Sequence, residues 1–157
     1  MKRLPVVTLL LFGMLSWTLA DTRRLTTFPA MMDALKQGKV VHLVVEYAKC
    51  KLKVDGEEVK APDAIGGMKL ETWEYFAKGV IRNDRAYVAS SETVLIAHPR
   101  HGHVFNYVRV RLYEDGKVEI TARYLKTGTY EVVMDETFTG EISGGKDDKA
   151  VSLFVAN

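Results

Sequence analysis

Apolar and polar residues alternate along most of the chain, in runs separated by short polar turns. From Val40 to Tyr47 every second residue is apolar on one face, a period that predicts a strand. Further runs of strand composition cover residues 69–76, 86–90, 92–98, 103–113, 117–125, 129–138 and 150–155. Because antiparallel neighbours need only short turns whereas parallel ones need long crossovers, this spacing predicts an antiparallel meander.

One helix is expected before these strands. Thr26 or Thr27 can cap its N-terminus, Pro29 suits its first turn, and Gly38 ends it. Its docking face consists of residues at helical spacing, namely Phe28, Met31, Met32 and Leu35. The expected fold class is α+β and mainly β: one N-terminal helix packed on an antiparallel meander sheet, which is either open or curled into an incomplete barrel.

Residues 53–68, KVDGEEVKAPDAIGGM, mix charges with one proline and three glycines. This composition favours turns over a regular element and predicts a long loop. The pair Gly66-Gly67 has two interpretations, an anion cradle or a hinge. The flanking strand, helix and spacing of a phosphate loop are missing, which favours the hinge or turn.

Two hairpin registers can be predicted from glycine positions. In YEDGK, a three-residue loop with Gly116 in the left-handed position sets apolar residues opposite one another and Arg111 beside Glu119. In LKTGT, the same geometry at Gly128 sets Arg123 opposite Glu131. The full expected pairs are Leu112–Val118, Val110–Ile120 and Val108–Ala122 in the first hairpin, then Tyr124–Tyr130, Ala122–Val132 and Ile120–Met134 in the second. The sheet thereby acquires one apolar and one charged face.

The charged face carries the candidate ligand residues Tyr107, Arg109, Arg111 and Arg123, together with Tyr113. One interpretation is that they line the inside of a small barrel and hold an anionic ligand, because guanidinium groups bind carboxylates well. The other is a solvated face stabilised by cross-strand ion pairs. Because glutamates are expected opposite two of the arginines, the second interpretation is favoured.

The stretch HPRHGH, residues 98–103, contains three of the four histidines of the chain. Pro99 and Gly102 suit a hairpin turn, and a four-residue connection would make His98 and His103 direct cross-strand neighbours. Two facing imidazoles could share a metal ion, but zinc sites use three or four protein ligands. We therefore predict a structural hairpin, with His98 and His103 only weak metal candidates.

The first twenty residues have the layout of a signal peptide: two basic residues, an apolar core and small residues before Asp21. A retained anchor is the alternative, but the apolar run is shorter than the roughly 20 residues that a membrane span needs. The expected organisation is a signal peptide, residues 1–20, and a single domain, residues 21–157. The protein is expected to be periplasmic or extracellular, and not an integral membrane protein after cleavage.

Cleavage would leave 20 basic and 20 acidic residues. A formally neutral chain lacks the positive field that attracts phosphates, so nucleic acid is excluded as an expected partner. The single Cys50 is either a thiol activated by Lys49 and Lys51 or a small half-buried residue, and a disulfide-linked dimer stays open. No catalytic motif is present, so no catalytic residue and no cofactor is expected.

Three long runs resemble the VirK family of small exported proteins from Gram-negative bacteria: APDAIGGMKLETWEYF, SSETVLIAHPRHGHVFNYVRVRLYEDGKVEITARYL and YEVVMDETFTGEI. The likeness extends from PAMMDALKQGK through Ile142 and includes EYAKC, which ends at Cys50. The resemblance implies export and an association with virulence. It carries no catalytic or ligand residues over to this chain.

Three functions remain open at this point. The favoured one is a secreted or periplasmic, virulence-associated accessory protein that binds a protein or a small molecule without catalysis. The second is a calyx-like carrier of a small anionic ligand, lined by Arg109, Arg111 and Arg123. The third is a small enzyme that depends on a metal at His98 and His103 or on Cys50.

Overall fold

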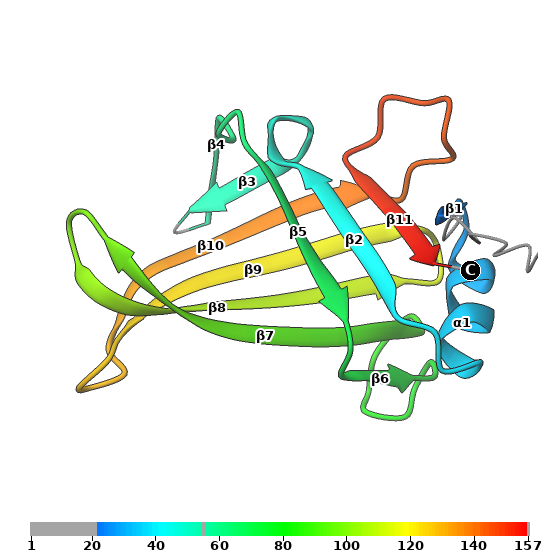
Figure 1. Cartoon of the computed structure of the whole chain (residues 1–157), viewed down its shortest axis with the longest axis horizontal. Coiled ribbons are helices and arrows are strands. Elements are labelled where there is room, and N and C mark those ends of the chain that lie inside the picture. The colour runs from blue at the N-terminus through cyan, green and yellow to red at the C-terminus, as the bar shows by residue number, and fades with distance from the viewer. Residues whose placement is uncertain (1–21, 55, 157) are drawn as a thin grey trace, which may run out of the picture.

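The computed structural model describes residues 22–54 and 56–156, which form one α-helix, one 3₁₀ turn and eleven strands (Figure 1). The order of elements along the chain begins with β1 (Thr22–Leu25), α1 (Phe28–Lys36), β2 (Val41–Glu46), the 3₁₀ turn (Tyr47–Lys49), β3 (Lys51–Val54), β4 (Glu57–Val59) and β5 (Ile65–Leu70). It continues with β6 (Trp73–Phe76), β7 (Tyr87–His98), β8 (Gly102–Tyr113), β9 (Lys117–Lys126), β10 (Val132–Glu141) and β11 (Val151–Ala156). The predicted signal peptide lies outside the described residues.

The helix forms where its capping residues predict it. The Thr27 hydroxyl accepts a hydrogen bond from the Ala30 amide at 3.3 Å, and Pro29 occupies the first turn. Gly38 follows the helix with φ +74°, a left-handed conformation that glycine adopts without steric cost. The predicted apolar residues Phe28, Met31, Met32 and Leu35 are all buried. The helix is therefore confirmed with its cap, its docking face and its end.

The strands form two antiparallel sheets rather than one. The smaller sheet has the order β1-β11-β2-β5, and the larger has the order β4-β3-β10-β9-β8-β7-β6. The meander is confirmed within the larger sheet, from β6 through β10. The smaller sheet crosses over one half of the larger, and the long strands β7 to β10 run on beyond it (Figure 1). The fold is thus mainly β with one helix, and the sheets do not close into a barrel.

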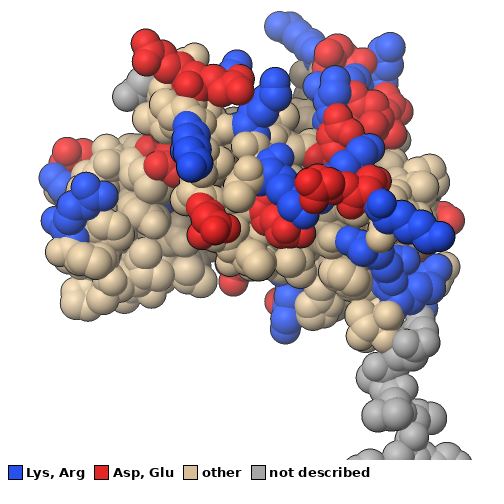
Figure 2. All heavy atoms as spheres, turned by 90° about the horizontal axis from the view of Figure 1, so that it is seen from above, with Lys and Arg blue, Asp and Glu red and all other residues tan. Residues whose placement is uncertain are grey.

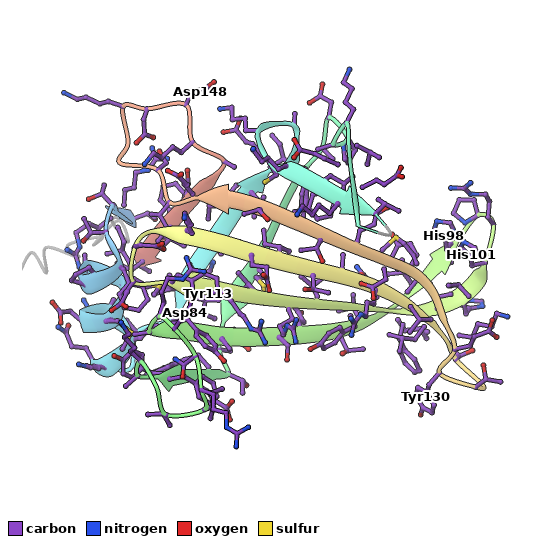
Figure 3. All side chains as sticks on the ribbon, turned by 180° about the vertical axis from the view of Figure 1, so that it is seen from behind. Asp84, His98, His101, Tyr113, Tyr130 and Asp148 are labelled. Atoms are coloured by element: carbon purple, nitrogen blue, oxygen red, sulfur yellow. The ribbon has the colours of Figure 1, made fainter. Side chains whose placement is uncertain are left out.

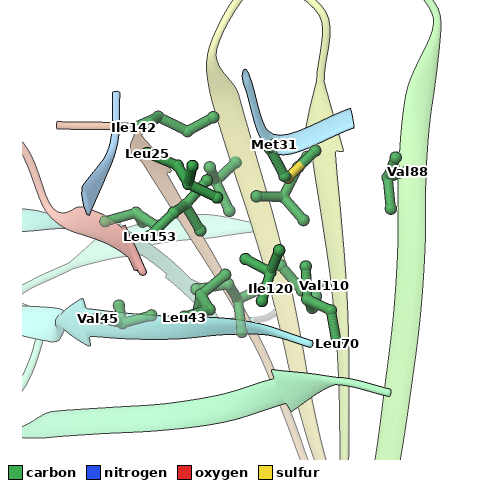
Figure 4. Packing of buried hydrophobic residues seen from close by; sticks show 14 of the residues in the cluster. Leu25, Met31, Leu43, Val45, Leu70, Val88, Val110, Ile120, Ile142 and Leu153 are labelled. Atoms are coloured by element: carbon green, nitrogen blue, oxygen red, sulfur yellow. The ribbon is translucent and has the colours of Figure 1, made fainter. Parts of the chain in front are cut away.

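The hydrophobic core fills the space between the sheets at the end where α1 packs (Figure 4). Its fully buried residues come from both sheets because alternate residues of each strand point inward. Those from the smaller sheet include Val41, Val45, Leu70, Leu153 and Val155, and those from the larger include Val88, Val110, Leu112, Val118 and Ile120.

The β8–β9 register is confirmed, with Leu112 opposite Val118 and Arg111 opposite Glu119. The predicted β9–β10 register is wrong by four residues, because Ile120 lies opposite Phe138 instead of Met134. The turn is wider than predicted: the left-handed residue is Tyr130, at φ +58°, and not Gly128. The Tyr130 ring stacks on Phe105 with centroids 6.0 Å apart, a contact that supports this uncommon conformation.

The long loop predicted over residues 53–68 is also wrong. The segment contains the end of β3, all of β4 and the start of β5. Strands β3 and β4 form a hairpin around Gly56, at φ +88°, in which Leu52 is buried and all of β4 is exposed. Their charged residues lie at the edge of a sheet, where water solvates them, so the composition resembled that of a loop.

Strand β1 was not predicted, because its sequence TRRL lacks an apolar alternation. It pairs antiparallel with β11, and Leu25 is 1% exposed. The Arg24 guanidinium donates hydrogen bonds to the hydroxyls of Ser143 and Ser152, and lies 5.4 Å from the centre of the Phe154 ring. These distant contacts hold a strand that local composition does not specify.

Candidate functional site

A cavity of about 330 Å³ opens between the sheets, next to the hydrophobic core. This volume falls within the range of small-molecule sites. Strands β2 and β5 provide one wall, and β7, β8 and β9 provide the other. The lining residues are Leu43, Val45, Tyr47, Gly66, Gly67, Met68, Glu92, Val94, Asn106, Val108, Val110 and Ile120.

Strand alternation explains why most of these side chains are apolar. Glu92 lies opposite Val108 and Val94 lies opposite Asn106, so all four share the face of the larger sheet that looks toward the smaller one. Two polar side chains, Glu92 and Asn106, interrupt that apolar face. They place a carboxylate and an amide beside the apolar walls.

The two glycines of β5 let the opposite wall approach closely. A Cβ atom at Gly66 would lie 2.8 Å from Cε2 of the Tyr47 ring, and one at Gly67 would lie 2.9 Å from the carbonyl oxygen of Leu43. Both glycines pair with β2, opposite Val45 and Val44. The hinge interpretation of this pair is therefore wrong. Two glycines inside an apolar run are the signal that predicts such close packing.

Tyr47, at the start of the 3₁₀ turn after β2, adds a half-buried polar group to this wall. Its ring packs against Phe138 at a centroid distance of 4.7 Å. Burial raises the pKa of the Tyr47 phenol, and nearby Cys50 and Tyr124 raise it further. The phenol consequently stays protonated at neutral pH and can donate a hydrogen bond at the cavity wall.

The candidate arginines lie on the opposite, outer face of the larger sheet. Arg111 contacts Glu119 at 3.3 Å and Arg123 contacts Asp135 at 2.9 Å. Arg123 was expected beside Glu131, but the shifted register gives it this aspartate instead. These pairs are partly exposed and contribute little stability, roughly 0.2 to 1 kcal/mol each.

Arg109 donates to the Thr121 hydroxyl at 3.4 Å on the same outer face. Tyr107 and Arg123 line a shallow depression there, of about 410 Å³, with Phe105 and Tyr130. The structure therefore brings two of the four candidate ligand residues together, at a site separate from the cavity between the sheets. The binding role of Tyr107, Arg109, Arg111 and Arg123 stays a prediction.

The predicted pairing of His98 with His103 is wrong. His98 lies opposite Gly102, and His103 lies opposite Ala97, so the two imidazoles project from opposite faces. The loop spans residues 99–101 because Gly102 adopts φ +67° and begins β8. Among residues 22–54 and 56–156, no group of three or more histidine, cysteine or acidic side chains has the arrangement that could hold a metal.

His98 has a local role in the hairpin. Its Nδ1 accepts hydrogen bonds from the backbone amides of Arg100 at 3.2 Å and His101 at 3.3 Å. The ring stacks on His101 at 4.8 Å and meets Tyr124 at 5.1 Å. Figure 3 shows His98 and His101 together at the tip. The side chain thus completes a three-residue turn, one residue shorter than the predicted connection.

Cys50 is buried, with 9% of its surface exposed, and its Sγ lies 3.9 Å from the carbonyl oxygen of Glu46. Burial raises the pKa of the thiol, which opposes its activation by the lysine neighbours. Lys49 instead contacts Glu46 at 2.8 Å and Asp148 at 2.6 Å. The geometry supports a small packing residue at a strand end.

Within the described part of the chain, no helix has the length and apolar character of a membrane span.

Comparison with known proteins gives a consistent result. The family model described as VirK protein matches residues 24–130. The crystal structure of lpg1832, a VirK family protein from Legionella pneumophila, superimposes with a TM-score of 0.62 at 19% sequence identity, and the match covers 83% of this chain and 98% of that one. At this identity the structural likeness establishes the fold alone. No curated protein matches the sequence. The family model spans more than half of the chain, which therefore belongs to the VirK family.

Proposed function

We propose that this protein is an exported, non-enzymatic binding factor that holds a small ligand in the cavity between its two sheets. Membership of the VirK family supports a virulence-associated protein. The observation that carries the binding role is the cavity itself, whose apolar walls meet Glu92 and Asn106. A preformed concave site with a few polar groups is the usual form of a small-molecule site.

The wall chemistry favours a ligand with an apolar body and a basic or hydroxyl-bearing head. The Glu92 carboxylate accepts hydrogen bonds and attracts cations, whereas Asn106 and Tyr47 provide neutral polar groups. None of the described residues that line the cavity is lysine, arginine or histidine. An anionic head would therefore face a carboxylate without a cation to balance it, which argues against an anionic ligand at this site.

The same lining supports binding rather than catalysis. Its titratable side chains, among the described residues, are Glu92 and Tyr47. A raised pKa keeps the Tyr47 phenol protonated, which makes it a poor nucleophile. One carboxylate beside a neutral phenol lacks the oriented nucleophile and base that covalent catalysis uses.

Alkyl chains of equal length with an ammonium or a carboxylate head test this proposal. Titration calorimetry should give tighter binding for the decylammonium ion than for decanoate. Glu92→Gln should weaken ammonium binding about fivefold, a modest effect because the side chain is exposed to solvent. Val108→Phe should weaken both by about tenfold or more, because the larger side chain fills the cavity.

Glu58→Gln provides the matched control, because Glu58 is exposed on β4 and does not line the cavity. Binding that prefers decanoate, or that survives Val108→Phe unchanged, would contradict the proposed ligand class and site.

Export has its own test. Cleavage after Ala20 should leave Asp21 as the first residue of the protein recovered from the periplasm or the medium, because Thr18, Leu19 and Ala20 precede it in the pattern of a signal-peptidase site. N-terminal sequencing of that material reads the result directly. Material that retains Met1 and sediments with membranes would identify residues 1–20 as an anchor instead.

A further inference from the structure

The distal half of β7 has an open edge. Strand β8 pairs with β7 along its whole length, from Tyr87 to His98. On the other side, β6 pairs only from Tyr87 to Ser90. Residues 91–98 therefore have no neighbouring strand on that side within the described structure. In Figure 1 this part of β7 extends past β6 toward the tip of the β7–β8 hairpin.

We propose that this edge pairs with the same edge of a second copy of the chain and joins two larger sheets into one continuous sheet. The proposal goes beyond ligand binding in the cavity. An exposed edge presents unpaired amides and carbonyls, and is a template for pairing with another strand. Two copies of one edge can pair about a two-fold axis, which gives a closed dimer.

The sequence of the segment distinguishes it from the other edges. Strand β1 carries two arginines, β4 has three residues of which two are glutamates, β5 contains two glycines and Lys69, and β6 is a four-residue strand with Glu74. Short length, charge and glycine all discourage strand addition. The run from Thr93 to Ala97, TVLIA, has no charge, glycine or proline.

Most side chains of this segment are exposed, including large apolar ones, and Ile96 and His98 are half-buried. Val94 is 42% exposed and Leu95 is 58% exposed. By contrast, the side of the molecule opposite the β7 edge, seen from above in Figure 2, carries many charged side chains. An uncharged and β-branched strand edge is the surface that sheet extension requires.

The backbone register identifies which amides are available. At the base of the hairpin, the Glu114 amide donates to the Ala86 carbonyl at 3.0 Å. Hydrogen-bonded and non-hydrogen-bonded pairs alternate in an antiparallel ladder, so the even-numbered residues of β7 bond to β8. The amides of the odd-numbered residues consequently point toward the open edge. They belong to Ser91, Thr93, Leu95 and Ala97.

One register of the dimer also matches the side chains. With Leu95 opposite the partner's Leu95 on the two-fold axis, Val94 lies opposite the partner's Ile96 and Glu92 lies opposite the partner's His98. Symmetry repeats both pairs. A shift that sets Glu92 opposite the partner's Ile96 loses this polar match, and a carboxylate opposite an apolar residue gains no cross-strand stabilisation.

The geometry of His98 suits the pair with Glu92. Because its Nδ1 accepts two backbone hydrogen bonds, the neutral ring carries its proton on Nε2. The hydrogen on Nε2 is then available to a carboxylate. Glu92 is exposed and forms no ion pair among the described residues. Each partner thus supplies the donor or the acceptor that the other lacks.

Sedimentation equilibrium of the cleaved protein should show a monomer–dimer equilibrium. Leu95→Lys should raise the dimer dissociation constant about tenfold or more, because two ammonium groups then face each other at the two-fold axis. Val132→Lys is the matched control. Val132 is 47% exposed on the outer face of the same sheet but lies on β10, away from the edge, so its substitution should change the constant by less than about twofold.

Cysteine substitution tests the register without depending on a charge. Opposed residues in a hydrogen-bonded pair have Cα atoms about 5.5 Å apart, a separation that a disulfide can span. Leu95→Cys should therefore give a disulfide-linked dimer under mild oxidation, and Val94→Cys should not. Circular dichroism verifies that each variant is folded.

A protein that stays monomeric up to high concentration would overturn the proposal. So would a dimer that Leu95→Lys leaves intact, or cross-linking through Val94→Cys instead of Leu95→Cys. Val108→Phe, which fills the cavity, should leave the dissociation constant unchanged, and Leu95→Lys should leave ligand binding by the monomer unchanged. Failure of the dimer and failure of the cavity proposal are therefore separate results.

Discussion

Leu153→Ala is expected to lower the free energy of unfolding by about 3 kcal/mol, because it removes buried methyl groups and leaves a cavity in a packed core. Leu153 is 0% exposed in β11, which lies between β1 and β2 in the smaller sheet. Its side chain projects toward Leu25 and Ile142 in the core (Figure 4). Urea unfolding followed by circular dichroism measures the change.

Ile65→Ala controls for the loss of an apolar side chain. Ile65 is 74% exposed in β5, so its truncation should change the free energy of unfolding by less than about 0.5 kcal/mol. Equal losses for the two variants would contradict the burial of Leu153. They would also place the hydrophobic core somewhere other than between the two sheets.

Gly67→Ala should destabilise the protein by about 1 to 3 kcal/mol, the usual cost of overpacking. The added methyl group would lie 2.9 Å from the carbonyl oxygen of Leu43, and backbone cannot move aside as a flexible side chain can. Strand β5 must then move away from β2, which changes the cavity wall. The variant should therefore also alter the affinity for the decylammonium ion.

Gly128→Ala is the matched glycine control. A Cβ atom at Gly128 meets no atom within 4 Å. The backbone there is not left-handed, so alanine should be neutral or stabilise by up to about 1 kcal/mol through the unfolded chain. The comparison measures the free energy of unfolding of both variants. If neither Gly67→Ala nor Gly128→Ala lowers the free energy of unfolding, then β5 does not pack closely on β2.

Ligand binding and strand pairing use neighbouring parts of one strand. Glu92 lies at the cavity wall, and in the proposed dimer it also faces the partner's His98. Its carboxylate would then be shared between a basic ligand head and the imidazole. Substitutions at Val108, which lines the cavity, and at Leu95, which does not, therefore separate the two sites.

The sequence by itself determined those elements that are specified by neighbours in the chain. The helix could be predicted because its capping threonine, first-turn proline and terminal Gly38 act on adjacent backbone groups. The β8–β9 register could be predicted because Gly116 fixes a short turn, at φ +83°, and alternation then decides which residues face the core. The family resemblance, carried by long runs of sequence, is confirmed as well.

Turns closed by distant or side-chain contacts could not be predicted in this way. Tyr130 adopts its left-handed conformation while stacked on Phe105, a residue of another strand, and this widens the β9–β10 turn. His98 accepts two backbone hydrogen bonds and thereby shortens the turn after β7. Local composition indicated that a glycine sets the geometry of each turn. The resulting error was four residues in the β9–β10 register and one residue in the β7–β8 register, and such an error changes every cross-strand pair of the hairpin.

Only the tertiary structure decided that there are two sheets and where they separate. The chain changes sheets between Leu70 and Trp73, inside a run whose composition predicts one strand. This crossing brings residues 43–47 and 66–68 over residues 92–110 and forms the cavity. It also leaves the distal half of β7 without a neighbouring strand on the side away from β8, within the described residues. Alternation along a strand determines which side chains share a face, but the sheet that will cover that face depends on contacts between distant segments, which strand periodicity does not encode.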